Sequence, residues 1–212
     1  MVKNQVIAFV ALIIIIAIVV FSFFIVQDDN EDSYNLDVFE VSDENDDART
    51  FTAELSTLGY ETENGVWQSL QLSPSYSFGV RFINVTIPTN VTLVDAYVEL
   101  YSTGSPGLDH PNCNIYCDNA DDSVNFTLAG ALNISGRNYT ENFATWNTTV
   151  TYGEWVKSPS ITSLVQEVIS RENWTSGNSI TVLFVTNKYS GYAATFQNYE
   201  RGYPAKLYIK WK

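Results

Sequence analysis

The chain has 212 residues and a formal net charge of −13 at pH 7, from 24 acidic and 11 basic side chains. This balance argues against nucleic acids and anionic lipid surfaces as partners, because both require a basic patch. One histidine and two cysteines leave few side chains for metal or nucleophilic chemistry.

The N-terminal part predicts a membrane-spanning helix. Residues 6–26 contain no charged side chain, and Ser22 is their only polar one. A helix of this length covers about 30 Å, the thickness of a bilayer core. A cleaved signal peptide is the alternative, but its apolar stretch is shorter, about 7–15 residues, and ends in a small-residue cleavage site that residues 22–26 lack.

The charges on either side of this helix predict its orientation. Lys3 precedes it, whereas ten carboxylates occur between Asp28 and Asp47, before the first basic residue, Arg49. Positive flanks remain in the cytoplasm. We therefore expect a cytoplasmic N-terminus (1–5), a transmembrane helix (6–26), an acidic linker (27–35) and an extracellular domain (36–212), at the cell membrane.

Asparagine sequons indicate an extracellular address. Seven N-x-S/T sequons occur, and none lies in the first eighty residues. Asn and Thr also suit β loops, but this density favours N-glycosylation, which requires exposure. Together with the short segment before the predicted helix, this density of sequons favours an archaeon or an archaeal virus as the source. The expected acceptors are Asn84, Asn90, Asn125, Asn133, Asn138, Asn147 and Asn173.

The two cysteines, Cys113 and Cys117, are close in sequence. In an oxidising compartment such a pair most simply forms a disulfide, which stiffens one small loop. Asp109 and His110 lie just upstream, so a metal site is the alternative. Zinc sites usually have tighter C-x-x-C spacing or further histidines, and His110 is the only one.

Period-two alternation of apolar residues dominates the domain and predicts strands. It occurs at residues 78–84, where Phe78, Val80 and Phe82 share a face. It recurs at 94–100, where Val94, Ala96, Val98 and Leu100 share a face, and again at 207–211. Residues 180–185 are apolar on both parities, which predicts a strand buried within a sheet. Many short strands with one helix predict a mainly β fold, an antiparallel β-sandwich.

The exception is a predicted amphipathic helix within residues 158–178. Ile161, Leu164, Val165, Val168 and Ile169 form an apolar stripe. Ser158 and Pro159 suit an N-cap and first helical position. Glu167 and Arg171 are spaced for an i, i+4 ion pair. Trp155 and Trp174, which flank the helix, are interpreted as packing residues.

Several blocks of sequence resemble a known family. They are residues 79–98 (GVRFINVTIPTNVTLVDAYV), Trp146, Gly153, Trp155, 158–161 (SPSI), 165–168 (VQEV), Trp174, 176–178 (SGN) and 204–211 (PAKLYIKW). In this order they resemble the DNRLRE-like β-sandwich modules of microbial surface and secreted proteins, over most of residues 36–212. The resemblance implies a sandwich of jelly-roll or Greek-key type with an accessory, adhesive or structural role. The chain departs from the pattern at Ser160 and Tyr192, and 105–123 looks like an insertion.

Few residues predict chemistry. The only histidine lies beside a proline, so a Ser-His-Asp triad is not expected. Glu167 is the candidate for a catalytic acid, but its expected ion pair with Arg171 is a sufficient structural reason for its presence. We therefore expect no enzyme activity. The acidic clusters 43–47 and 118–122 have the oxygen ligands that calcium prefers, but not the EF-hand spacing. Solvated acidic loops are the preferred interpretation, and no cofactor is expected, with calcium as the alternative.

The expected function is that of a membrane-anchored, glycosylated surface protein with structural or adhesive contacts. Its expected partners are the bilayer, through residues 6–26, N-linked glycans, and copies of itself or other envelope proteins. A pilin-like filament subunit, with a leader cut after Lys3, is the first alternative. A carbohydrate-binding module is the second, because exposed aromatic rings can stack on sugars; aromatic residues make up 14% of the chain.

Overall fold

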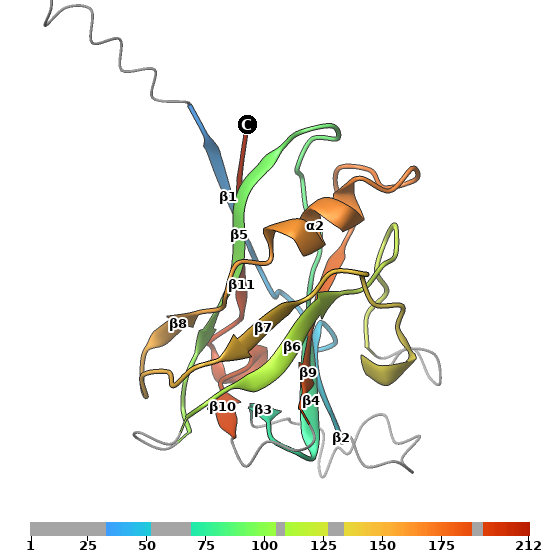
Figure 1. Cartoon of the computed structure of the whole chain (residues 1–212). Helices are drawn as coiled ribbons and strands as arrows, with labels where there is room; N and C mark the ends of the chain where they lie inside the picture. The colour runs from blue at the N-terminus through green and yellow to red at the C-terminus, as the bar shows by residue number, and fades with distance from the viewer. Residues whose placement is uncertain (1–32, 52–68, 105–108, 127–133, 188–192) are drawn as a thin grey trace, which may run out of the picture. The chain divides into compact units, whose positions relative to one another are not determined.

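A computed structural model describes residues 33–51, 69–104, 109–126, 134–187 and 193–212, and Tyr34–Lys212 form one compact unit (Figure 1). The predicted transmembrane helix at 6–26 and most of the predicted linker lie outside the described residues. In the part of the chain that is described, no helix is both long and apolar enough to cross a bilayer.

The domain is mainly β, and all pairings between its strands are antiparallel, which is consistent with the predicted β-sandwich. A four-stranded sheet has the order β1 (Asn35–Glu40), β11 (Lys206–Trp211), β5 (Leu93–Tyr101), β8 (Trp155–Lys157). A five-stranded sheet has the order β2 (Asp47–Phe51), β4 (Tyr76–Phe82), β9 (Ile180–Thr186), β6 (Asn112–Cys117), β7 (Ala144–Asn147). The remaining elements are β3 (Leu70–Leu72), β10 (Ala194–Phe196), α2 (Thr162–Ile169) and two 3₁₀ turns, η1 (Ile134–Gly136) and η2 (Tyr199–Arg201).

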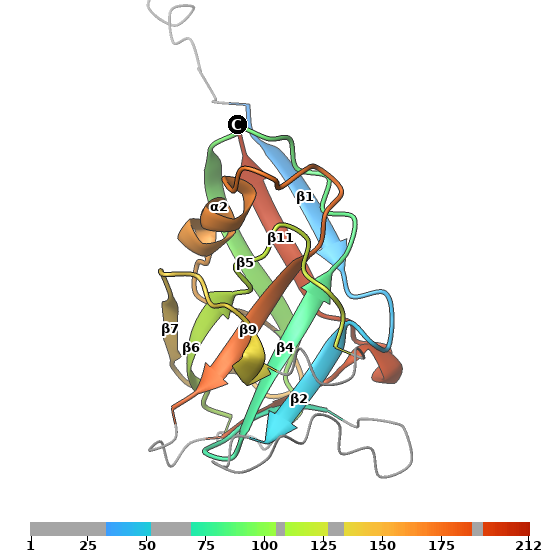
Figure 2. The ribbon, with the colours of Figure 1, turned by 90° about the vertical axis from the view of Figure 1, so that its right-hand side faces the viewer.

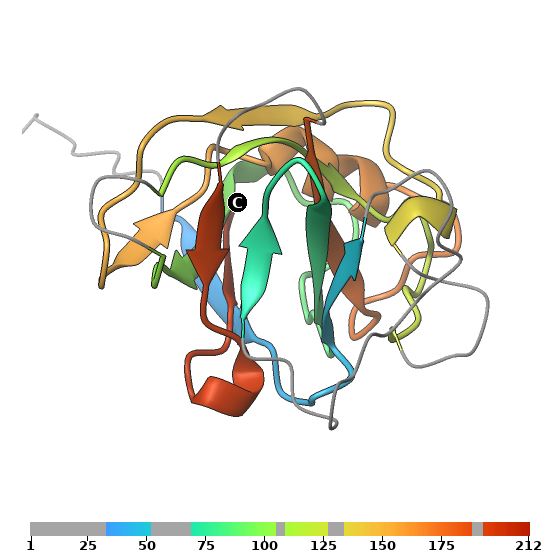
Figure 3. The same cartoon turned by 90° about the horizontal axis from the view of Figure 1, so that it is seen from below.

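The two larger sheets form two layers with the main core between them. Figure 2 shows β2, β4 and β9 in front of β1, β11 and β5, and Figure 1 shows the same two sets apart. The inner face of the five-stranded sheet carries Phe78 and Phe184, whose rings stack 4.5 Å apart, and the fully buried Trp146. The pair β3–β10 lies side by side across one end (Figure 3) and adds Phe196 to these rings.

The predicted alternation is confirmed at Phe78, Val80 and Phe82, all fully buried. On β5 it is confirmed at Ala96, Val98 and Leu100 but is wrong at Val94, which is 39% exposed. The reason is a bulge: the register of β11 against β5 shifts between Lys210 and Trp211, so that Leu93 pairs with Trp211 and takes the buried position.

Strand β9 is buried on both faces, as its sequence predicts, and it is the middle strand of its sheet. Its outer face is covered by a segment that we name the outer layer, residues 118–126 and 134–142. Phe126 and Ile134 of the outer layer pack on Leu183. This small second cluster removes the apolar outer face of β9 from water.

Arg137 joins the two segments of the outer layer to each other, and its Nη1 also lies 3.4 Å from Thr181 Oγ1 on β9. Its side chain is fully buried, and its Nη1 lies 2.7 Å from Asp118 Oδ2 and 2.8 Å from Ser123 Oγ. Its Nη2 donates to the carbonyl of Val124, and its guanidinium lies over the Phe126 ring at 4.4 Å. A buried ion pair is tolerated when further hydrogen bonds support both groups, as they do here.

Segment 158–169 covers the free edge of β5 beyond β8. The Ser158 and Ile161 amides donate to the carbonyls of Val98 and Ala96. In return Ser158 Oγ, Thr162 Oγ1 and Gln166 Oε1 accept the amides of Val98, Ala96 and Leu93. The predicted apolar stripe is confirmed, since its five members are buried. The segment therefore protects an edge that would otherwise expose unpaired amides.

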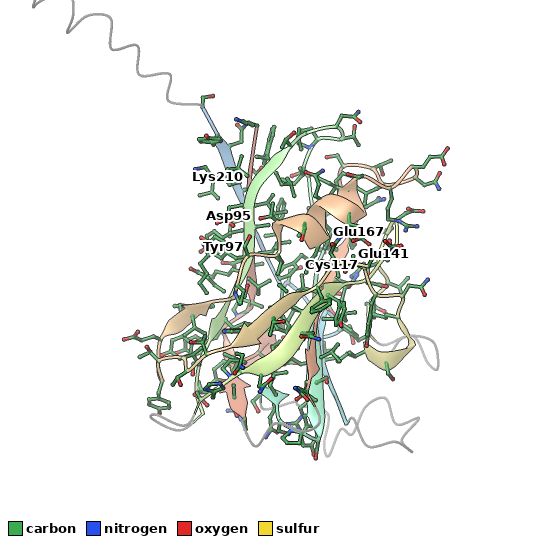
Figure 4. All side chains as sticks on the ribbon, viewed as in Figure 1. Asp95, Tyr97, Cys117, Glu141, Glu167 and Lys210 are labelled. Atoms are coloured by element: carbon green, nitrogen blue, oxygen red, sulfur yellow. The ribbon has the colours of Figure 1, made fainter. Side chains whose placement is uncertain are left out.

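Two details predicted for this helix are wrong. It begins at Thr162, and Ile161 takes the cap position because the Ser158 hydroxyl is used on β5. Glu167 and Arg171 bind other residues instead of forming an ion pair with each other. Glu167 accepts the amides of Glu141 and Asn142, and Arg171 binds Asp121 at 2.6 Å. Both charges attach the helix to the outer layer, and Figure 4 shows Glu167 beside Glu141.

Substitution Gly79→Ala tests how closely the outer layer packs. An added Cβ would lie 2.7 Å from Phe126 Cζ and 3.0 Å from Leu183 Cδ2. Overpacking of this kind costs about 1–3 kcal/mol, measurable by urea unfolding. Phe126→Leu shortens the clashing ring, so the double variant should lose less than the sum of the two single losses. Additive losses would contradict the close contact.

Candidate functional site

The sequon asparagines that the structure describes are accessible. Asn84, Asn90, Asn138, Asn147 and Asn173 are exposed and Asn125 is half-buried, while Asn133 lies outside the described residues. Asn84 and Asn90 have positive φ, 51° and 66°, a conformation that asparagine tolerates better than most residues. These two positions therefore also have a conformational reason to be asparagine.

The described sequons lie in three places. Asn84 and Asn90 are in the β4–β5 loop, and Asn173 follows α2. These loops are joined by hydrogen bonds between Val85 and residues 177–178. The same end of the domain holds the start of β1 and the C-terminus, because Asn35 pairs with Trp211 and Thr92 with Lys212. Asn125 and Asn138 belong to the outer layer, and Asn147 ends β7.

The disulfide predicted between Cys113 and Cys117 is absent, and both residues are free thiols. They lie four residues apart on one strand, β6, and both point into the core. An extended strand separates such Cα atoms by about 13 Å, whereas a disulfide needs about 4.4–6.8 Å. Burial raises the pKa of both thiols well above its usual range, so they are unreactive as nucleophiles or metal ligands.

The acidic clusters bind arginine and backbone amides. Asp46 pairs with Arg81 at 2.6 Å, and Asp118 and Asp121 pair with Arg137 and Arg171. Within the described ranges no three His, Cys, Asp or Glu side chains are placed to hold a metal ion. His110 contacts Asn147 Oδ1 at 2.7 Å and Thr149 Oγ1 at 3.1 Å, which are the two functional side chains of one sequon.

Asp47, at the start of β2, is a buried carboxyl of a different kind. It is 1% exposed, Oδ2 accepts the Tyr199 amide at 2.9 Å, and Oδ1 has no hydrogen-bond donor among the described residues. Burial raises the pKa of Asp47 to about 7. The Tyr199 amide opposes this rise, and Glu200 and Asp46 add to it. The group is therefore partly protonated near neutral pH.

One feature that the sequence did not predict is the outer surface of the four-stranded sheet, which we name the lysine–tyrosine face. Charged, aromatic and aliphatic side chains alternate outward here, and Figure 4 shows Asp95, Tyr97 and Lys210 on the side of β5 and β11 away from α2. Its members are Leu36, Val38, Glu40, Asp95, Tyr97, Glu99, Tyr101, Trp155, Lys157, Lys206, Tyr208 and Lys210. The period-two pattern of 94–100 was the available signal.

Aromatic side chains on this face contact one another and the lysines. Tyr97 stacks on Tyr208 at 4.8 Å, and Lys157 Nζ lies 3.5 Å from the centre of the Tyr97 ring. Trp155 lies edge-on to Tyr101 and is 38% exposed, so its predicted packing role is wrong. It points outward because it pairs with Tyr101 on the solvent side of β5. Trp174 is 2% exposed, which confirms its packing role.

No known family matches this chain, and no curated protein matches it either. The resemblance to DNRLRE-like modules therefore stays a prediction, and the candidate site is defined by the sequons and the lysine–tyrosine face.

Substitution Asp47→Asn tests the buried carboxyl. A carboxyl with a raised folded-state pKa binds a proton more tightly when folded, so stability is full below pH 4 and falls as pH rises towards 7. The asparagine variant lacks this loss and should be more stable than the native chain at pH 8, by at most about 4 kcal/mol. Near pH 4 the two should be similar. Parallel pH profiles of the unfolding free energy would contradict the assignment.

Proposed function

We propose that this chain is a membrane-anchored, N-glycosylated cell-surface protein whose sandwich, of jelly-roll or Greek-key type, has a structural or adhesive role in the envelope. The observation that carries the proposal is the distribution of sequons. Those described lie at one end of the domain, on the outer layer and at the end of β7, and none lies on β1, β11, β5 or β8. Glycans at these positions would shield most of the domain and leave the lysine–tyrosine face free for contacts.

Sequence features outside the described residues support the anchor. The uncharged stretch 6–26 is long enough to span a bilayer, and the charge asymmetry around it favours a cytoplasmic N-terminus and an external domain. The fold also supports a binding or structural role. Its arginines have structural roles: Arg137 joins the two segments of the outer layer, and Arg171 attaches the chain after α2 to that layer.

Carbohydrate binding is a second candidate, favoured by one observation. Trp155 and Tyr203 are 38% and 37% exposed and form a cluster with Tyr101, in which Tyr101 and Tyr203 stack at 4.2 Å and Trp155 lies 6.3 Å from Tyr203. Exposed rings of this kind can stack on sugar rings. The cluster is small, and its rings are already in contact with one another, so we place this function second.

Glycosylation is tested with a matched pair of substitutions at Thr86, which is exposed. Thr86→Ala destroys the sequon of Asn84, and Thr86→Ser preserves it. In full-length protein from a glycosylating host, mass spectrometry should show glycan loss only in the alanine variant. N-terminal sequencing of the same preparation should find Met1 to Lys3 still present, because a pilin leader would be removed after Lys3 whereas a membrane anchor is not cut there. Protease added to intact cells should digest the domain, because the domain is expected outside the membrane. A native mass equal to that of the bare chain would contradict the proposal.

Carbohydrate binding is tested on a glycan array with the native protein and Trp155→Ala. If the aromatic cluster binds sugar, the variant should lose about two- to twelvefold in affinity, since one stacked ring contributes about 0.5–1.5 kcal/mol. Phe143→Ala is the matched control, because Phe143 is exposed but lies away from this cluster. Equal binding by both variants, or none by the native protein, would remove this candidate.

A further inference from the structure

A row of alternating charges crosses the lysine–tyrosine face. Glu40 lies directly opposite Lys206, Lys206 opposite Glu99, and Glu99 opposite Lys157, one residue from each of the four strands. Lys206 Nζ is 3.3 Å from Glu40 Oε1. The signs along the row are therefore minus, plus, minus, plus, in the strand order β1, β11, β5, β8.

Two further rows lie on the same face. One contains Val38, Tyr208 and Tyr97, and the next contains Leu36, Lys210 and Asp95. Across the three rows, Lys157, Lys206 and Lys210 balance Glu40, Asp95 and Glu99, so the face carries no net charge although the chain carries −13. Leu36 and Val38 are 61% and 45% exposed, so the face also presents aliphatic surface to a partner.

This pattern is complementary to itself in one orientation. A two-fold axis parallel to the strands, running between β11 and β5, places a second face over the first with the strand order reversed. Strand β1 then lies over β8, and β11 over β5, at the same height along the strands. Each charge in the row meets its opposite, with Glu40 over Lys157 and Lys206 over Glu99. Lys210 also meets Asp95, and Tyr97 meets Tyr208.

We propose that two copies of this chain pair through their lysine–tyrosine faces about this axis. A contact of this type is isologous, since each contact between two different residues occurs twice, once from each copy. Facing sheets pack about 10 Å apart, so the long lysine and tyrosine side chains reach across. The other two-fold axis in the plane, across the strands, would place lysines of β11 over lysines and acids of β5 over acids. Charge therefore selects the first arrangement.

A second copy fits this face better than an unrelated partner for two reasons. The arrangement directs both chains into the pair from the same end, and this suits two anchors in one membrane, a point that rests on the proposed function. The face is also free of described sequons. Its footprint, about 30 Å by 15–20 Å from strand dimensions, is at the low end for a specific interface. Confinement to a membrane would compensate by raising the effective concentration.

The experiment uses the full-length chain in detergent micelles, co-purified in pairs that carry two different affinity tags. Native chains should capture each other. Lys206→Glu and Glu99→Lys should each reduce self-capture at least tenfold, because each places two pairs of like charges in contact. Mixing the two variants should restore capture, since every charge at position 206 then meets an opposite charge at position 99 of the other copy. Arg201→Glu is the matched control, because Arg201 is exposed and is not a member of the face, and this variant should capture normally.

The mixing result separates pairing from a role within one chain. Lys206 and Glu99 are also neighbours in the same sheet, and damage to that contact cannot be repaired by a second molecule. Undiminished self-capture by either variant would overturn the proposal, as would failure of the mixture when circular dichroism shows both variants folded. Capture in micelles needs neither glycans nor a particular membrane orientation, so failure here is distinct from failure of the proposed function.

Discussion

The structure depends on a constraint set by β9, which is apolar on both faces and lies in the middle of its sheet. One face is covered by the opposite sheet, and the other needs a second cover. The cover is an irregular segment, the outer layer. Strands use their backbone hydrogen bonds within the plane of the sheet, so a segment packed on the face of a sheet has to be attached mainly through side chains. Arg137 holds the two segments of this layer together over β9, because its guanidinium binds Asp118, Ser123 and Val124 and lies 3.4 Å from Thr181 Oγ1. Losing such an arginine would leave Asp118 buried and uncompensated, which typically costs about 3–5 kcal/mol.

The two outer surfaces of the sandwich are consequently different. The five-stranded sheet is covered by the outer layer, and this cover carries the sequons of Asn125 and Asn138. In the described part of the chain the four-stranded sheet has no such cover, so its outward side chains meet solvent directly. They are organised in rows across the strands, in which aromatic rings stack and opposite charges alternate. Cross-strand neighbours of this kind are the unit of sheet stability. The same rows give the face its neutrality and self-complementarity.

Much of this architecture could be predicted from periodicity, and the failures have specific causes. Alternation identified β4, β5 and β11, and an apolar stretch identified β9. A bulge at Lys210–Trp211 nevertheless moved Val94 outward, and a bulge has no signature in a single strand. The disulfide was predicted on the assumption that the two cysteines lie in a loop. They lie on one extended strand instead, so Cys113 and Cys117 share a face of the sheet but are too far apart to bond. The Glu167–Arg171 pair followed helical spacing, but both side chains have stronger partners on the outer layer. The row Glu40–Lys206–Glu99–Lys157 joins residues far apart in sequence, and only the sheet order reveals it.

Arginine and lysine are used differently in the two halves of the domain, and this division follows from their chemistry. Arg81, Arg137 and Arg171 each bind several acceptors at fixed positions, for which the planar guanidinium is suited. Lys157, Lys206 and Lys210 instead lie on the lysine–tyrosine face, and Lys157 reaches Asp95 at 3.2 Å with its ammonium over Tyr97. A lysine on a flexible stem can exchange a neighbour in its own sheet for one on a second sheet without moving the backbone. Charges that fix a fold and charges that can accept a new partner therefore require different residues, and this chain places each kind on the appropriate sheet.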